Sequence, residues 1–307
     1  MSLLASAGMW AGADRHSITL CKTGHDARAA PFWGFRLVCH AGAHRSRPTR
    51  RCARPALPAI VTIVKIRKSP FFRIAAASLM LVAAYSALLC FPEPFFAFSL
   101  RADHLILHSD QPLAGPAAQH VLYLAQAKLA ASPLYSSRQD RHVFICNARW
   151  RQMLFFNKDY GVGAVAPYPV TANVFLRDAR VADDRLLSPR GTPVPGDRTL
   201  DYFIAHEITH QLTGREIGPL RYFRLPQWVR EGYADYVGKG GSFKYEEARR
   251  AYLAGVPEMD WNKSGLYWRF NLEVAYLLDR RRWPVSQLLR DPPPEQVVDA
   301  AISSPRP

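Results

Sequence analysis

Residues 200–236 have the sequence LDYFIAHEITHQLTGREIGPLRYFRLPQWVREGYADY, and this stretch decides the fold of the surrounding chain. Its first part, residues 200–213, predicts a helix, because residues 197–199 (DRT) can cap its start and Gly214 suits the position just past its end. Its last part, residues 225–236, predicts a second helix with a proline in the first turn. Two neighbouring helices are therefore expected, each with polar side chains on one face.

The first helix carries two histidines one turn apart. His206 and His210 share a helix face because residues four apart lie one above the other. Their imidazoles can therefore bind one tetrahedral metal ion. Glu207 leaves the same helix beside them, near enough to reach a water on that metal, which is the arrangement behind the HExxH pattern. The competing interpretation is a surface helix with two solvated histidines.

The second helix adds two carboxylates on one face. Trp228, Glu231 and Asp235 stand at positions i, i+3 and i+7, so they point the same way. Carboxylates that face inward need a metal or a hydrogen-bond donor. We expect Glu231 to be the third metal ligand and Asp235 to accept the free ring N–H of a metal-bound histidine, His206. The alternative for Asp235 is an exposed helix carboxylate.

These two segments resemble a known group of enzymes. HEITH, followed 21 residues later by Glu231 of LPQWVREGYADY, is similar to the gluzincin metallopeptidases, particularly the peptidase-MA-like families. Those families pair HExxH with Trp-x-x-Glu-Gly-x-Ala on the next helix. The resemblance continues to Tyr267 and to residues 276–277 (YL), and it covers about residues 200–289. The chain departs from the pattern at residues 280–282, three arginines where many relatives have a glycine after an arginine or tyrosine.

The resemblance implies an α+β, zincin-like domain, with a small mixed sheet and active-site helices, that hydrolyses peptide or protein substrates. Zn²⁺ would be held by His206, His210 and Glu231, with one position left for water. Glu207 would take a proton from that water and pass it to the leaving amine.

Two further roles follow from the same resemblance. Tyr267 would donate a hydrogen bond to the oxyanion. The strand just before the metal helix would pair with the substrate backbone, which here indicates residues 173–176.

Two other classes of function compete with a peptidase. The first is a catalytically inactive zinc-binding interaction module of the same fold, and an intact Glu207 argues against it. The second is an intramembrane protease, which would need HExxH inside an apolar span. Arg198, Asp201, Arg215 and Glu216 flank a helix that is too short and polar to cross a bilayer.

The chain before the metal helix has an α/β pattern. Short apolar runs predict strands at residues 104–108, 143–146 and 173–176. Apolar residues at helical spacing predict a helix at residues 116–131. Residues 188–197 are rich in proline and glycine and predict a loop.

An uncharged run at residues 74–92, IAAASLMLVAAYSALLCFP, has about the minimum length of a membrane span. Four basic residues within 65–73 precede it, and none follows directly, which favours a single-pass protein with a cytoplasmic N-terminus. The catalytic domain would then be periplasmic or extracellular. A cleaved signal peptide and a buried soluble helix are the alternatives.

The positive charge is concentrated at the N-terminus. Residues 1–73 contain 13 Lys/Arg and 2 Asp/Glu, a net charge of +11, which leaves +4 of the formal +15 for the rest. A modest charge without a known nucleic-acid-binding motif predicts that the protein has no nucleic-acid partner. We divide the chain into a basic, disordered region at 1–63, an anchor or signal segment at 64–95, and a peptidase domain at 96–307. Residues 1–63 could instead be a targeting arm or sequence upstream of the natural start.

Overall fold

The structure is a computed structural model that describes residues 70–157, 162–188, 190–194, 196–240 and 244–304. The chain divides into two units, Met1–Lys65 and Ile66–Pro307. The first unit, and with it the disorder expected for residues 1–63, lies outside the described residues. The second unit contains both the apolar segment and the domain that follows.

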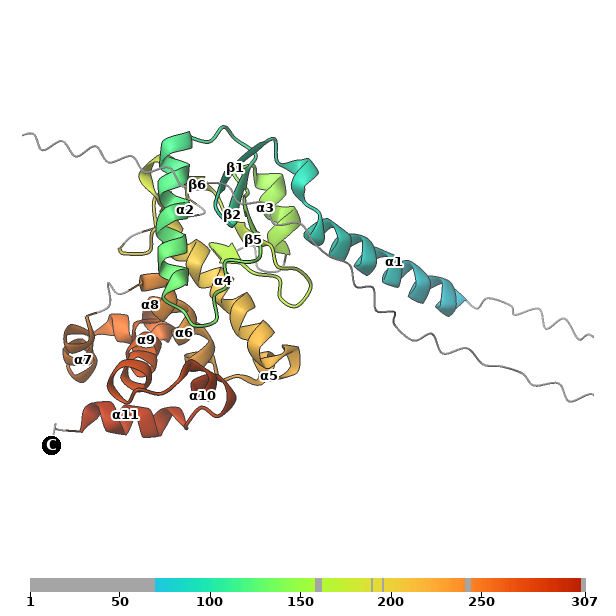
Figure 1. Ribbon diagram of the computed structural model, residues 1–307. Helices are drawn as coiled ribbons and strands as arrows, with labels where there is room; N and C mark the ends of the chain where they lie inside the picture. The colour runs from blue at the N-terminus through green and yellow to red at the C-terminus, as the bar shows by residue number, and fades with distance from the viewer. Residues whose placement is uncertain (1–69, 158–161, 189, 195, 241–243, 305–307) are drawn as a thin grey trace, which may run out of the picture. The chain divides into compact units, whose positions relative to one another are not determined.

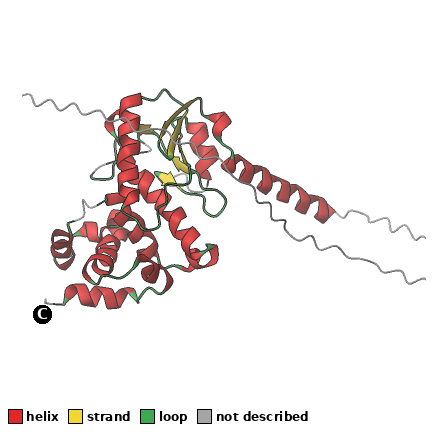
Figure 2. Ribbon diagram, in the orientation of Figure 1, coloured by secondary structure: helices red, strands yellow, loops and turns green. Residues whose placement is uncertain are grey.

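The second unit is a mixed α+β structure, as the sequence predicts (Figures 1 and 2). Its helices are α1 (Pro70–Cys90), α2 (Gly115–Ala130), α3 (Arg149–Phe156), α4 (Leu200–Ile217), α5 (Pro219–Arg224), α6 (Gln227–Lys239), α7 (Tyr245–Leu253), α8 (Trp261–Ser264), α9 (Trp268–Ala275), α10 (Val285–Arg290) and α11 (Glu295–Ser303). Its strands are β1 (Phe98–Ala102), β2 (Leu105–Ser109), β3 (Arg141–Ile145), β4 (Ala164–Val165), β5 (Val174–Leu176), β6 (Ala179–Arg180) and β7 (Arg185–Leu186). Short helical turns η1 (Glu93–Phe95), η3 (Val181–Asp183), η4 (Pro257–Met259) and η5 (Tyr276–Arg280) complete it.

The main sheet has the order β1-β2-β3-β5-β4. Its three central strands, β2, β3 and β5, run parallel, and the two edge strands run antiparallel to their neighbours. The three predicted strands are therefore the centre of the sheet, whereas the sequence pattern missed both edges. Edge strands are short and partly exposed, so they lack the apolar run that marks a strand buried on both faces.

Alternate residues of the central strands enter two separate cores. Val143, Ile145 and their neighbours face α2 and α4 in the larger core. Phe144 and Phe175 point to the opposite face, where they pack with α3 and with Leu89 of α1. The period of two along a strand produces this division. The sheet consequently connects the metal helix on one face with the end of the apolar helix on the other.

Helix α1 is long and apolar enough to cross a membrane. Most of its side chains are exposed, but its last turn enters the domain. The Asn173 side chain donates to the Leu89 carbonyl at 2.8 Å, and the Tyr85 hydroxyl donates to the Leu154 carbonyl at 3.1 Å. The end of the apolar helix is therefore fixed to the sheet and to α3.

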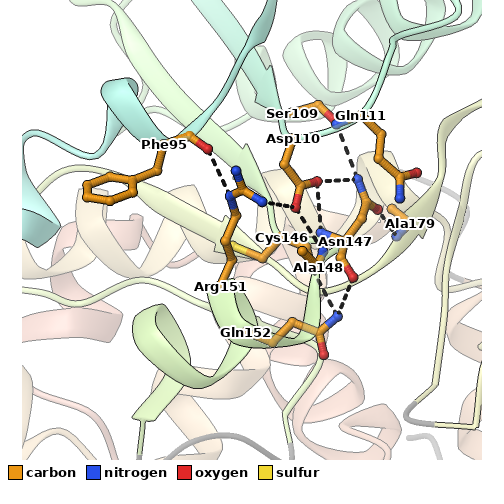
Figure 3. A network of polar contacts seen from close by, with 10 residues as sticks. All are labelled: Phe95, Ser109, Asp110, Gln111, Cys146, Asn147, Ala148, Arg151, Gln152 and Ala179. Carbon is orange, nitrogen blue, oxygen red and sulfur yellow. Dashed lines mark hydrogen bonds and ion pairs between the residues drawn. The ribbon is translucent and has the colours of Figure 1, made fainter.

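A polar network at the end of β2 holds α3 in place (Figure 3). The Asp110 carboxylate accepts from the backbone N–H groups of Asn147 and Ala148, at 3.1 and 2.8 Å, and from Nη1 of Arg151 at 3.2 Å. Arg151 also donates through Nε to the Phe95 carbonyl at 2.8 Å. The network ties the segment after α1 to the first turn of α3.

Helix α6 packs against both α4 and α9 below the sheet, and the three helices form the region of the predicted site (Figure 1). Gly232 on α6 allows the close approach of α9, because a Cβ atom there would lie 2.5 Å from the Phe270 carbonyl oxygen. The glycine of the Glu-Gly pair thus brings the start of α9 next to the ligand helices.

Candidate metal centre

The metal helix is longer than predicted. It continues through Gly214 to Ile217 and ends at Gly218, so the expected end at residue 213 is wrong. Gly214 has another purpose, since a Cβ atom there would lie 2.5 Å from the Tyr168 ring. The Tyr168 hydroxyl also donates to the Gly214 carbonyl at 2.7 Å. Close ring packing, not a chain reversal, requires glycine here.

Helix α4 begins at Leu200, as the capping residues 197–199 predict, but a different side chain accepts from the backbone at its N-terminus. Thr199 is the N-cap residue, yet its side chain makes no capping hydrogen bond to the helix backbone and bonds the Asp201 carboxylate instead. Oδ1 of Asp184 accepts from the Asp201 backbone N–H at 3.2 Å. A carboxylate from an earlier turn therefore satisfies the helix N-terminus.

The three predicted ligands meet. Nε2 of His206 and Nε2 of His210 are 3.2 Å apart, and Oε2 of Glu231 lies 3.6 and 3.4 Å from them. Ligand bonds of about 2.0–2.2 Å around a tetrahedral ion place donor atoms about 3.3–3.6 Å from one another. The three donors therefore have the spacing that one metal ion needs, and they can hold one.

The electrostatics of Glu231 agree with a ligand role. Burial alone would raise the pKa of its carboxyl group, but the two histidines beside it lower that pKa well below the usual range. Glu231 is therefore ionised, as a metal ligand must be. Nε of Arg230 also donates to Oε1 of Glu231 at 3.1 Å, which leaves Oε2 directed at the histidines.

Glu207 lies beside the ligands and is buried. Burial raises the pKa of its carboxyl group to about 7, and the charge of Glu231 adds to the rise. His210 and a hydrogen bond from the Ala166 backbone act in the opposite direction. A carboxylate with this proton affinity is suited to accept and return a proton near neutral pH.

Tyr267 is brought to the same centre from the start of α9. Its ring stacks on that of His206, with centroids 5.7 Å apart and planes at 12°. Its hydroxyl lies within electrostatic reach of Glu231 and Glu207. Burial, followed by the charges of Glu231 and Glu207, raises the pKa of this hydroxyl, so it remains a donor.

The direct hydrogen bond expected between Asp235 and His206 is not formed, and other partners take its place. Oδ1 of Asp235 accepts from the Tyr202 hydroxyl at 2.5 Å, and Oδ2 accepts from the Asn271 side chain at 2.8 Å. The Tyr202 oxygen in turn lies 3.4 Å from Nδ1 of His206. Tyr202 stands between the two because it lies one turn before His206 on the same face and its longer side chain reaches Asp235 first.

Sequence reasoning missed Tyr202 and Asn271. The signal for Tyr202 was its position four residues before a ligand, which places it on the ligand face. Asn271 stands one turn after Tyr267, but nothing in the sequence relates α9 to Asp235. Its contact arises from the close packing of α6 and α9.

His210 differs from His206 in its surroundings. Its Nδ1 atom is buried and has no hydrogen-bond partner within the described residues. The Tyr222 ring lies edge-on to it, with centroids 6.4 Å apart. On the Nδ1 side of His210, ring packing therefore takes the place of a hydrogen bond.

The strand expected to pair with the substrate is not available for pairing. Phe175 and its neighbours in β5 are buried, with β3 on one side and β4 on the other. Among the described strands, β4 forms the edge of the sheet on this side, next to Ala166. The correction follows from the strand order, since β5 precedes the metal helix in sequence but lies inside the sheet.

Comparison with known proteins does not assign the chain to a group: no family model matches it, and no curated protein matches it either. The geometry of the site is therefore the basis for a functional conclusion.

Proposed function

We propose that this protein is a zinc-dependent peptidase of zincin-like fold, anchored in a membrane by α1. The observation that carries the proposal is the meeting of His206, His210 and Glu231 at tetrahedral spacing beside the buried carboxylate of Glu207. Two nitrogen donors and one carboxylate oxygen are the ligand set of catalytic zinc sites.

Each residue of the centre has a role in peptide hydrolysis. When bound, zinc supplies Lewis acidity, which activates water and polarises a carbonyl. Glu207 accepts the proton of the attacking water and passes it to the leaving amine. The Tyr267 hydroxyl donates to the carbonyl oxygen as negative charge develops there. The free edge of β4 pairs with the substrate backbone, because its unpaired N–H and C=O groups can accept an extended peptide.

The membrane part of the proposal rests on α1. Its apolar side chains are exposed along most of its length, which is costly in water and favourable in lipid. We infer a single pass with the N-terminus in the cytoplasm and the metal centre outside it. A reporter domain fused after Pro307 should be active only outside the cytoplasm, and a cytoplasmic signal would overturn this orientation.

Substitution of Glu207, the proposed general base, tests the proposed peptidase activity directly. The full chain, purified in detergent and loaded with zinc, should hydrolyse a peptide library. Glu207→Gln should keep the metal and lose at least about a hundredfold in rate, the lower range for loss of a general base. Full hydrolysis by this variant would contradict the mechanism. No hydrolysis by the wild type, with zinc bound, would favour the inactive interaction module.

A further inference from the structure

The apolar helix meets the domain without a spacer. Leu89, in the last turn of α1, is 5% exposed because it is part of the core behind the sheet. The first strand begins at Phe98, only a few residues later. A bilayer that contains α1 must therefore lie directly against the domain, and the surface around the end of α1 must face the lipid headgroups.

That surface carries exposed apolar side chains. On α3, Trp150 and Met153 are 50% and 59% exposed and lie three residues apart, on one face of the helix. On α5, Leu220 and Phe223 are 76% and 59% exposed with the same spacing. Each pair gives its helix an apolar outer side that no described part of the chain covers.

Contacts connect α5 to the end of α1. The Cys90 thiol donates to the Val170 carbonyl at 3.4 Å. Two residues before Val170, the Tyr168 ring lies 6.5 Å from that of Phe223 and 5.1 Å from that of Tyr222. The surface thus runs continuously from the end of α1, through the loop after β4, to α5.

Apart from Glu93, just after α1, whose side chain is 42% exposed, the charges on this surface are positive. Helices α3 and α5 contain four arginines and no acidic residue, and the loop at 166–172 contains no charge. Arg149, Arg221 and Arg224 are exposed and form no ion pair within the described residues. Arg151 is paired with Asp110 (Figure 3), and its guanidinium carbon lies 4.2 Å from the centroid of the Trp150 ring. Arginine beside exposed aromatic and aliphatic side chains is the composition of a membrane-surface contact.

We propose that α3, α5 and the loop at 166–172 form a headgroup contact that holds the domain flat on an anionic phospholipid bilayer. Leu220 and Phe223 insert at the level of the headgroups, while Arg221 and Arg224 bind lipid phosphates.

The inner side of α5 carries Tyr222, next to His210. The contact therefore keeps the metal centre close to the bilayer surface, where peptide segments that emerge from the membrane are its substrates. This substrate class rests on the proposed peptidase function, and the contact itself rests only on α1 as a span.

Hydrogen–deuterium exchange of the full chain tests the contact. The protein is compared in nanodiscs of phosphatidylcholine and in nanodiscs that also contain phosphatidylglycerol. Peptides from α3 and α5 should exchange more slowly in the anionic discs. Peptides from α7 and α11 should exchange equally in both.

Charge variants test whether the arginines of α5 cause the slower exchange in anionic discs. The double variant Arg221→Glu, Arg224→Glu should reduce the lipid-dependent slowing of hydrogen exchange in α5 by on the order of 25-fold. This corresponds to about fivefold for each arginine near an anionic surface. Arg221→Lys with Arg224→Lys should retain it. Arg250→Glu, at an exposed arginine of α7, is the matched control and should change nothing.

Two outcomes would overturn the proposal. If α1 is protected in both discs and α5 exchanges at the same rate in each, the headgroup contact is wrong while the anchor stands, and the exposed face would suit a protein partner. If α1 is unprotected as well, the membrane anchor fails with it. Neither outcome depends on zinc or activity, so failure of the peptidase assignment is a separate result.

Discussion

The hydroxyl of Tyr202 donates a 2.5 Å hydrogen bond to Oδ1 of Asp235, from α4 to α6. Both groups are almost fully buried, at 2% and 1% exposure. The same hydroxyl oxygen lies 3.4 Å from Nδ1 of the ligand His206. A phenol thus transmits the orienting effect of a carboxylate to a metal-binding imidazole. Groups of this kind fix the ring orientation and tautomer of a ligand.

Tyr202→Phe should therefore weaken zinc binding by roughly 10- to 100-fold, the usual loss when a group behind a ligand is removed. It should also cost about 1–3 kcal/mol of stability, because the Asp235 carboxylate loses a donor in a buried place. Tyr233→Phe is the matched control, since that buried hydroxyl forms a hydrogen bond with Ser132. Competition with a zinc chelator measures both affinities. Equal losses in the two variants would show that Tyr202 has a purely structural role.

Metal content tests the ligand set. Purified wild-type protein should hold one zinc ion per chain, removable by a chelator, because three donors converge at one point. His210→Ala should abolish binding, since two remaining ligands cannot retain the ion through purification. His120→Ala, at an exposed histidine of α2, should bind normally. Atomic absorption gives the stoichiometry, and equal zinc in wild type and His210→Ala would refute the assignment.

Tyr267→Phe separates a catalytic hydroxyl from a packing ring. The ring stacks on His206, so the phenylalanine variant should keep its fold and zinc. If the hydroxyl stabilises the oxyanion, kcat should fall by roughly 10- to 1000-fold with KM nearly unchanged. Steady-state kinetics and a melting curve on this variant decide between the two roles. An unchanged kcat would remove Tyr267 from the catalytic residues and leave the metal site intact.

The pH dependence of stability has an identifiable contributor outside the group of candidate metal ligands. Burial raises the pKa of Glu273 to about 9, against an ordinary value of 4.5, although Arg269 opposes the shift. The folded protein therefore keeps this proton between about pH 4.5 and 9, while the unfolded chain releases it. This group's stabilisation is fully present below pH 4.5 and is lost as the pH rises towards 9, by at most about 1.4 kcal/mol per pH unit.

Glu273→Gln should remove that dependence, because the amide imitates the protonated acid. The melting temperature of the variant should rise relative to wild type as the pH increases from 5 towards about 9. Glu216→Gln, at a partly exposed carboxylate that pairs with Arg290, is the control and should not show the trend. If the melting temperatures of wild type and Glu273→Gln changed with pH in parallel, Glu273 would be ionised in the folded protein.

Much of the fold could be predicted because its central elements carry local signals. Strands β2, β3 and β5 are apolar runs, and α2, α4 and α6 have helical spacing, so each was found within a few residues. Helix α5, the edge strand β4 and the C-terminal end of α4 lacked such signals. Gly214 shows why: the sequence offers a glycine near the end of a helical pattern, and only the Tyr168 ring packed on it reveals that the helix continues.

The sequence by itself determined which side chains share a face: His206 and His210 in α4, and Trp228, Glu231 and Asp235 in α6. These relationships follow from 3.6 residues per turn, whereas the meeting of Glu231 with the two histidines depends on the packing of α6 on α4. Only the tertiary structure decided what Asp235 and β5 contact. The partner of Asp235 depends on how closely α4, α6 and α9 pack, and the position of β5 depends on strand order. Both are set by contacts between residues far apart in the chain, which no local period records.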